Sequence, residues 1–224
     1  MPLQCFPVRH AMGLRASVRF LFASDLHLTH WSPQVGHQLL RVVQEWRPDF
    51  VVLGGDLVDW PCAVGCLRDL IRQLADCTPV LAITGNHDHW VGLSRVRKTV
   101  REAGAILLDH PWTHERSGLE IHGSLPTGPA PPHSLLAIHN PSDFPKAVEA
   151  GFPLALAGHL HGCQFILWER AGLQYPGAWF YRYNGREFSR QRTRMVVSLG
   201  VHDTLPIRWN CPREVLAVEI TPEE

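Results

Sequence analysis

The stretch VLAITGNHDH at residues 80–89 joins a run of apolar residues to side chains that can bind a cation or transfer a proton. Four consecutive apolar residues, 80–83, are typical of a strand buried on both faces. Thr84 and Gly85 follow, and after them come Asn86, His87 and Asp88. A buried strand that ends in such side chains indicates a functional site at its end. Taken alone, the motif fits a turn with an Asx-type hydrogen bond equally well.

Two earlier segments repeat this pattern of a buried strand followed by polar side chains. The apolar runs at 18–23 and 50–53 lead into SDLH (24–27) and GGDLVD (54–59). Amphipathic helices are predicted between and after the strands, at 34–46, 63–75 and 94–103. Strands that alternate with helices predict a mostly parallel sheet covered by helices. Ligands of such sheets bind at the carboxyl ends of the strands. The three polar segments that directly follow the strands, here called polar corners, all lie at that end.

The second half of the chain predicts a second sheet with several antiparallel strands, because short apolar runs alternate with loops rich in glycine and proline. Strand candidates lie at 119–122, 134–138, 154–157, 165–168, 195–199 and 215–220. Asn184-Gly185 predicts a tight hairpin turn. The expected fold class is α/β, a four-layer αββα sandwich with two mixed sheets packed face to face. A single domain is expected at residues 18–224, after an N-terminal extension at 1–17 that we expect to be poorly ordered.

Composition and charge indicate neither a nucleic-acid partner nor a membrane-spanning segment. Lysine and arginine total 21 residues, and so do aspartate and glutamate. The overall charge therefore does not indicate nucleic acid as a partner. No run of about 18 apolar residues occurs, so no transmembrane segment is predicted. The six cysteines form no CxxC pair, which favours reduced thiols and a cytoplasmic location; the oligomeric state is left open.

Five polar corners occur in order along the chain: Asp25-Leu26-His27, Gly55-Asp56-Leu57-Val58-Asp59, Gly85-Asn86-His87-Asp88, His139-Asn140-Pro141 and Gly158-His159-Leu160-His161-Gly162. Together they resemble the calcineurin-like metallophosphoesterase superfamily, whose pattern is DxH, GDxxD, GNHD or GNHE, H, and GHxH. The C-terminal segments LPIR (205–208) and CPRE (211–214) are similar to the tail of the bacterial YkuE-like branch. The resemblance implies a metal-dependent phosphoesterase.

Seven side chains at these corners are the predicted metal ligands: Asp25, His27, Asp56, Asn86, His139, His159 and His161. Asp25, His27 and His161 are expected to hold one ion, and Asp56 to bridge it to a second. Imidazole, carboxylate and amide ligands without a thiolate suit two divalent or trivalent ions of Mn, Fe, Zn, Co or Ni. Because only two ligands are anionic, the bound ions would keep surplus positive charge, whereas a structural site is usually closed.

Other residues near the corners have predicted roles in catalysis or substrate binding. His87 is expected to face the phosphoryl group and to protonate the leaving oxygen. Asp88 is expected to hold the second ring nitrogen of His87. His30, His89 and Trp90 are candidate substrate-binding residues because they follow the metal-binding corners.

These features predict an enzyme, a metal-dependent phosphoric ester hydrolase that acts on a small-molecule phosphomonoester or phosphodiester. In the expected mechanism, a hydroxide that bridges the two ions attacks phosphorus while His87 assists the leaving group. One alternative is a pyrophosphatase of a nucleotide-linked lipid sugar. Another is a non-catalytic protein-binding scaffold on the same fold, which would predict the loss of ligand residues that are all present here.

Overall fold

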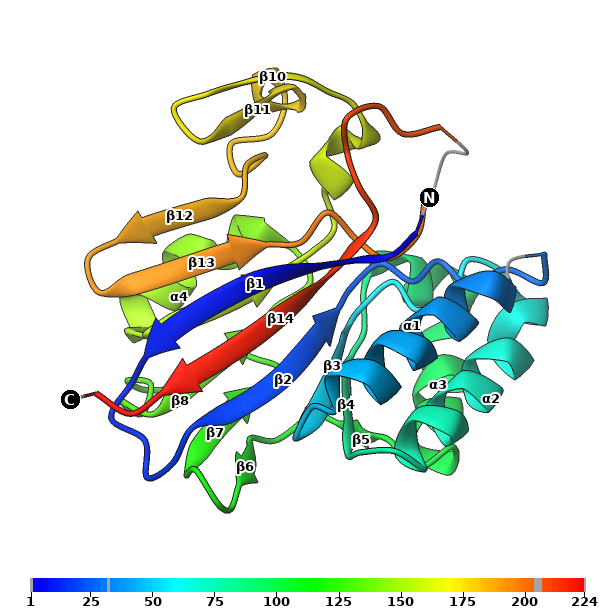
Figure 1. Ribbon diagram of the computed structural model, residues 1–224, viewed down its shortest axis with the longest axis horizontal. Helices are drawn as coiled ribbons and strands as arrows, with labels where there is room; N and C mark the ends of the chain where they lie inside the picture. Colours follow the sequence, from blue (N-terminus) through cyan, green and yellow to red (C-terminus); the bar gives the residue numbers. More distant parts are fainter. Residues whose placement is uncertain (1, 32, 204–206, 224) are drawn as a thin grey trace.

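The computed structural model describes residues 2–31, 33–203 and 207–223, and most of the strands in these residues form two six-stranded sheets (Figure 1). In spatial order, the first sheet contains β1 (Gln4–Ala11), β14 (Glu214–Thr221), β2 (Val18–Ala23), β3 (Phe50–Gly54), β4 (Val80–Ile83) and β5 (Ile106–Leu107). The second contains β12 (Glu187–Arg190), β13 (Thr193–Val197), β9 (Leu154–Ala157), β8 (Ser134–Ala137), β7 (Leu119–His122) and β6 (Trp112–His114). Both sheets combine parallel and antiparallel pairs.

Four helices cover the outer faces of the two sheets. The first sheet packs against α1 (Pro33–Trp46), α2 (Val64–Ala75) and α3 (Asn86–Glu102), whereas α4 (Phe144–Ala150) packs against the second (Figure 1). Short 3-10 turns lie at Pro61–Ala63, Pro141–Asp143, His161–Gln164 and Gly177–Trp179. The expected four-layer αββα sandwich is confirmed.

The alternation of side chains along each strand builds the layers. In β2, Phe20 and Phe22 point into the core between the sheets, while Leu21 packs under the helices. In β8, Leu135 faces the same central core and Leu136 faces α4. Successive side chains of a strand point to opposite faces, so a strand that is apolar throughout is buried on both sides.

More neighbouring strands of the second sheet run parallel than the sequence predicts. Its four central strands, β13, β9, β8 and β7, are mutually parallel, and only the edge strands β12 and β6 are antiparallel to their neighbours. Because neighbouring strands run in the same direction, the carboxyl ends of β8 and β9 lie together. That end of the second sheet meets the corresponding end of the first.

Two further differences concern local patterns. Residues Gln4–Ala11 do not form a loose extension but pair as β1 along the whole of β14; only Val8 of this strand is buried, so its sequence carries little strand signal. The turn between β12 and β13 is formed by Gln191 and Arg192, not by Asn184-Gly185. Asn184 is instead buried, and its Nδ2 donates a hydrogen bond to the carbonyl of Gln174.

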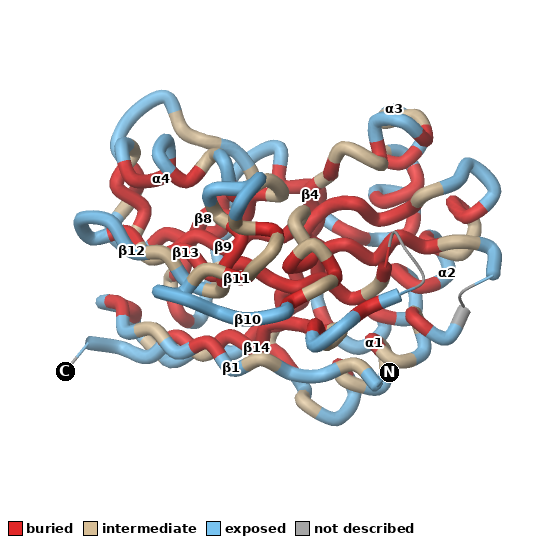
Figure 2. Tube along the Cα trace, turned by 90° about the horizontal axis from the view of Figure 1, so that it is seen from above, coloured by how far each residue is buried: buried red, intermediate tan, exposed pale blue. Residues whose placement is uncertain are grey.

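A small third sheet projects from the sandwich. It consists of β10 (Ile166–Arg170) and β11 (Leu173–Pro176), and β10 is exposed along most of its length (Figure 2). The loop after β11 carries the exposed Trp179, Phe180 and Tyr181. Of the helices in the described ranges, none has the length and apolarity required to cross a bilayer.

Candidate metal centre

All five polar corners meet where the carboxyl ends of the two sheets come together. Those of the first sheet follow β2, β3 and β4, and those of the second follow β8 and β9. Five of the predicted ligands have positive φ angles between 40° and 74°: Asp25, His27, Asp56, His159 and His161. Such backbone is uncommon in residues other than glycine and clusters at functional sites, where the surrounding structure maintains it.

Glycines in the motifs allow the corners to approach one another. A Cβ atom on Gly85 would overlap the carboxylate of Asp56, and one on Gly158 would overlap the carboxylate of Asp25. The backbone after β4 therefore packs directly on a predicted ligand that follows β3. The backbone after β9 packs in the same way on a ligand that follows β2, so the glycines are required for close approach between segments.

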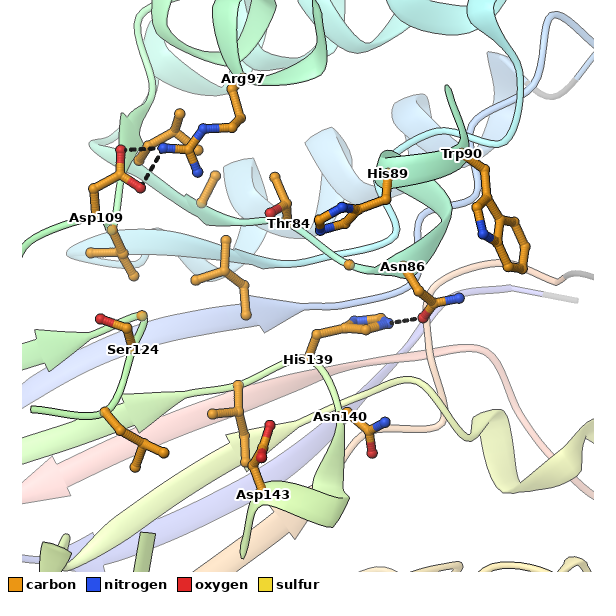
Figure 3. Close-up of a pocket in the computed structure, with 18 residues that line it drawn as sticks. Thr84, Asn86, His89, Trp90, Arg97, Asp109, Ser124, His139, Asn140 and Asp143 are labelled. Carbon is orange, nitrogen blue, oxygen red and sulfur yellow. Dashed lines mark hydrogen bonds and ion pairs between the residues drawn. The ribbon is translucent and has the colours of Figure 1, made fainter. Parts of the chain in front are cut away.

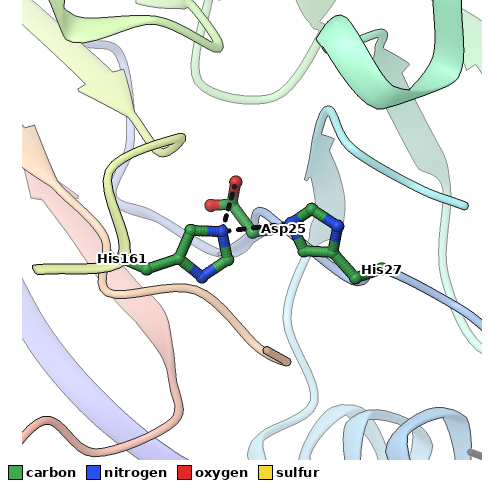
Figure 4. Close-up of side chains that lie close together, drawn as sticks. All are labelled: Asp25, His27 and His161. Carbon is green, nitrogen blue, oxygen red and sulfur yellow. Dashed lines mark hydrogen bonds and ion pairs between the residues drawn. The ribbon is translucent and has the colours of Figure 1, made fainter. Parts of the chain in front are cut away.

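The first cluster contains Asp25, His27 and His161, all of which are buried (Figure 4). The Nε2 atoms of His27 and His161 lie 3.0 Å apart, and His161 Nε2 lies 3.4 Å from Asp25 Oδ1. The Nδ1 atom of His27 is 2.6 Å from Asp59 Oδ1 and donates to it, because a carboxylate can only accept. The lone pair of His27 Nε2 therefore faces the cluster, as metal binding requires.

The second cluster contains Asp56, His139 and His159, with Asn86 beside them. His139 Nδ1 donates to the carbonyl of Gly54 at 3.0 Å. Its Nε2 atom lies 3.1 Å from Asp56 Oδ2 and 3.1 Å from Asn86 Oδ1. This position, between a carboxylate oxygen and an amide oxygen, suits a cation held by oxygen and imidazole ligands.

Asp56 stands between the two clusters. Its Oδ2 atom lies 3.1 Å from His139 Nε2 and 3.8 Å from His27 Nε2, whereas Oδ1 accepts a hydrogen bond from the backbone N–H of His87 at 2.8 Å. One oxygen of Asp56 therefore faces both groups of imidazoles while the other maintains the geometry of the corner.

The electrostatics of the centre favour bound positive charge. Burial by itself would lower the pKa of His139, but the carboxylates of Asp56 and Asp25 raise it to about 9. Burial would raise the pKa of Asp56, but the bond and charge of His139 lower it to about 2. Burial lowers the pKa of His161 to about 4, so its ring is neutral at pH 7. At pH 7 Asp56 is therefore ionised, whereas His139 carries a proton that a bound metal ion would displace, because imidazole binds a metal in its neutral form.

The predicted catalytic residue His87 lies beside the first cluster. Its Nδ1 atom lies 2.8 Å from Asp59 Oδ1, the same oxygen that accepts from His27. Its ring packs edge-on against His27, with centroids 4.6 Å apart, and contacts the indole of Trp90 at 4.5 Å. Asp59 therefore orients a predicted metal ligand and a predicted proton donor at the same time.

The prediction that Asp88 holds the ring of His87 is wrong. Asp88 is fully buried, and its carboxylate accepts from the backbone N–H groups of Leu57, Val58 and Gly85 at 2.9, 3.2 and 2.8 Å. At the start of α3 its side chain turns back toward the helix terminus, away from His87, and Asp59 from the neighbouring loop takes the expected role. Burial raises the pKa of Asp88 to about 6, although the three backbone bonds oppose the rise.

Replacement of Asp88 by alanine is expected to destabilise the protein. Three buried N–H groups would lose their acceptor, so the free energy of unfolding should fall by about 3–5 kcal/mol in urea denaturation. The exposed Asp69 on α2 provides a matched control, for which we expect little change. Unaltered stability together with lost turnover would instead restore a catalytic role for Asp88.

Two of the three candidate substrate-binding residues line a cleft next to the second cluster. His89 and Trp90 belong to this cleft, which has a volume of about 680 Å³ (Figure 3). His30 packs edge-on against Trp31, with centroids 5.4 Å apart, and lines neither this cleft nor the pocket at the metal centre.

Residues outside the five corners also line the centre. Tyr181 and Cys163 line a pocket of about 280 Å³ that also contains residues of both clusters. Nη2 of the buried Arg208 lies 3.3 Å from His161 Nδ1. No motif in the sequence assigned Tyr181 to the site. Of the LPIR segment, residues 205 and 206 lie outside the described residues.

The fold and the histidine and aspartate clusters define the class as an αββα metallohydrolase. The chain matches the Calcineurin-like phosphoesterase family over residues 18–163 and belongs to that family. It is therefore a metal-dependent phosphoester hydrolase.

Two curated relatives and one solved structure show how far the similarity extends. "Phosphodiesterase YaeI" of Escherichia coli is 27% identical over 236 residues, covering 95% of this chain and 87% of the relative. "Uncharacterized metallophosphoesterase YkuE" of Bacillus subtilis is a distant match, 26% identical over 64% of this chain and 58% of its own length. Phosphopantetheinyl hydrolase (PptH) of Mycobacterium tuberculosis has a TM-score of 0.50 at 13% identity, covering 81% of this chain and 89% of that chain, and shares the fold.

Proposed function

We propose that the protein hydrolyses a small-molecule phosphodiester with the help of two metal ions. The observation that carries this proposal is the position of Asp56, whose Oδ2 atom faces both imidazole clusters. Asp25, His27 and His161 would hold one ion, and Asn86, His139 and His159 the other, with Asp56 shared. The name of the relative YaeI supports a diester over a monoester.

The residues of the chain have distinct tasks in the proposed reaction. When bound, the ions would activate the attacking water and neutralise charge on the phosphoryl group. Asp59 holds Nδ1 of His87, and within the described chain the other ring nitrogen makes no hydrogen bond. His87 lines the pocket that contains both clusters, so this nitrogen can donate a proton to the leaving oxygen.

The complete ligand set supports an enzyme over a protein-binding scaffold. A scaffold would not require Asp59 to orient both His27 and His87 within 2.6 and 2.8 Å. The metal ions can be Mn, Fe, Zn, Co or Ni, since imidazole, carboxylate and amide ligands accept each of them.

Hydrolysis of chromogenic esters tests the proposal. Protein loaded with each candidate metal is expected to cleave bis(p-nitrophenyl) phosphate with a higher kcat/KM than p-nitrophenyl phosphate. Removal of the metal by a chelator should lower the rate at least ~10³-fold, because several kcal/mol of transition-state stabilisation are lost. Inactivity toward both esters with all five metals would contradict the proposed function.

A further inference from the structure

The cleft beside the second cluster is continuous with the proposed reaction site. It shares Asn86 and His139 with that cluster (Figure 3), and its lining includes the apolar side chains of Ile83, Leu108 and Ile138. Its volume of about 680 Å³ lies within the range of roughly 300–1,000 Å³ that ligand pockets occupy. A diester whose phosphoryl group lies at the clusters would therefore extend one of its organic groups into this cleft.

The acidic and basic side chains that line the cleft are already paired with one another or with neighbours. Arg97 Nη2 donates to both oxygens of Asp109 at 2.6 Å, and Arg101 donates to the same carboxylate at 2.8 Å. The carboxylate of Asp143 accepts from Lys146 at 2.7 Å. Among the described lining residues, no arginine or lysine is left unpaired to bind a second phosphate.

Several other polar side chains of the cleft, in contrast, have donors or acceptors that are not used within the described residues. Within the described residues, the hydroxyls of Thr84 and Ser124 and the ring of His89 make no hydrogen bond to the protein, and the Nδ2 group of Asn140 makes none either. Thr84 and His89 lie on the wall formed by the first sheet and α3, opposite Ser124 and Asn140 (Figure 3). Hydroxyl and amide groups both donate and accept, so they can pair with the hydroxyls of a ligand.

An exposed aromatic ring borders the same cleft. The indole of Trp90 is 76% exposed, although one part of it contacts the ring of His87. Trp90 therefore provides an apolar surface next to the reacting centre, against which the C–H groups of an organic ligand can pack. Apolar lining residues, charged side chains that are already paired, hydroxyl and amide groups without a partner and an aromatic edge together describe a site for an uncharged, hydroxylated group.

We propose that the cleft binds a neutral hydroxyl-bearing ester group, a polyol or sugar, and selects against substrates that carry a second phosphate. This inference rests on the proposed phosphodiesterase function and adds the substrate class to it. Thr84 and Ser124 are the specificity-determining residues, because they line opposite sides of the cleft and their hydroxyls make no hydrogen bond within the described residues.

Three methyl phosphodiesters that differ only in the second ester group test the proposal. The groups are glyceryl, methyl and 2-phosphoethyl, and hydrolysis by the metal-loaded protein is followed by phosphorus NMR. We expect kcat/KM for the glyceryl ester to exceed that of each of the others at least ~10-fold, mainly through KM. The methyl group cannot pair with the free hydroxyls, and the cleft offers no unpaired cation among its described residues to balance the second phosphate. A preference for the 2-phosphoethyl ester, or equal values for all three, would overturn the proposal.

The double variant Thr84→Val with Ser124→Ala tests the named residues. The ratio of kcat/KM between the glyceryl and dimethyl esters should fall about tenfold, the loss expected for two hydrogen bonds. The matched control is Thr127→Val with Ser142→Ala, which removes the same groups outside the cleft and should keep the wild-type ratio. The single variant Ser124→Ala is a second test in case the double variant is unstable, because Ser124 is remote from the predicted ligands. It should lower the ratio about threefold.

The outcomes separate this inference from the proposed function. An unchanged ratio in both cleft variants would overturn the inference while bis(p-nitrophenyl) phosphate is still hydrolysed. If the metal-loaded wild-type protein did not hydrolyse bis(p-nitrophenyl) phosphate, the proposed function would be overturned, and the inference with it.

Discussion

Replacement of Asp56 by asparagine is expected to remove both metal ions and to lower turnover at least ~10³-fold, because one oxygen of this carboxylate faces both clusters. An amide oxygen carries no formal charge and would compensate neither cation. The backbone conformation around residue 56 should be retained, since the asparagine oxygen can still accept a hydrogen bond from the backbone N–H of His87.

Metal analysis of the purified variant checks this result directly. The control is Asp76→Asn at the exposed end of α2, which should retain the metal content and turnover of the wild type. Full occupancy of both sites in Asp56→Asn would show that this carboxylate does not bridge them. Loss of one ion only would assign Asp56 to a single cluster.

Replacement of His87 by alanine is expected to separate metal binding from catalysis. The ring lines the pocket at the clusters but belongs to neither proposed set of metal ligands, and Asp59 fixes its orientation. Turnover should fall by about 10²–10⁴-fold for alkyl esters, the usual contribution of a positioned general acid, while both ions remain bound. The loss should be smaller for p-nitrophenyl esters, because their leaving group departs without a proton.

Rates for an alkyl ester and an aryl ester, measured beside the metal content, distinguish the possible roles of His87. The exposed His37 on α1 provides a control substitution that should change neither quantity. If His87→Ala lost metal, the side chain would be a ligand. If the rates for both kinds of ester fell equally, His87 would stabilise charge on the phosphoryl group instead of protonating the leaving oxygen.

The positions of the predicted ligands followed from short motifs because each ligand lies within a few residues of a buried strand. Apolar runs located β2, β3, β4, β8 and β9, and the carboxyl ends of the parallel strands brought the motifs together. The motifs did not show which carboxylate orients His87. Asp59 ends the GDLVD motif and Asp88 directly follows His87, yet only the path of the backbone decides which carboxylate reaches His87.

Residues that complete the centre from distant segments carried little local signal: LPIR (205–208) indicated only a similarity to a family tail, and Tyr181 belonged to no motif. Tyr181 lies in a loop after β11, and Arg208 follows the second sheet, but both contact the region of the clusters. The strand β1 was missed for a related reason: its exposed side chains show no apolar period, and its place is determined by pairing with β14.

By itself the sequence determined the αββα architecture, the order of the main strands, the metal-binding residue types and the family, because periodicity and motif chemistry are local properties. Tertiary structure alone decided that Asp56 presents a single oxygen to both clusters and that Asp59, not Asp88, orients His87. It also decided that a cleft whose charged side chains are already paired opens beside Asn86. Those features depend on distances between segments far apart in the chain, which packing of the two sheets establishes and no local pattern encodes.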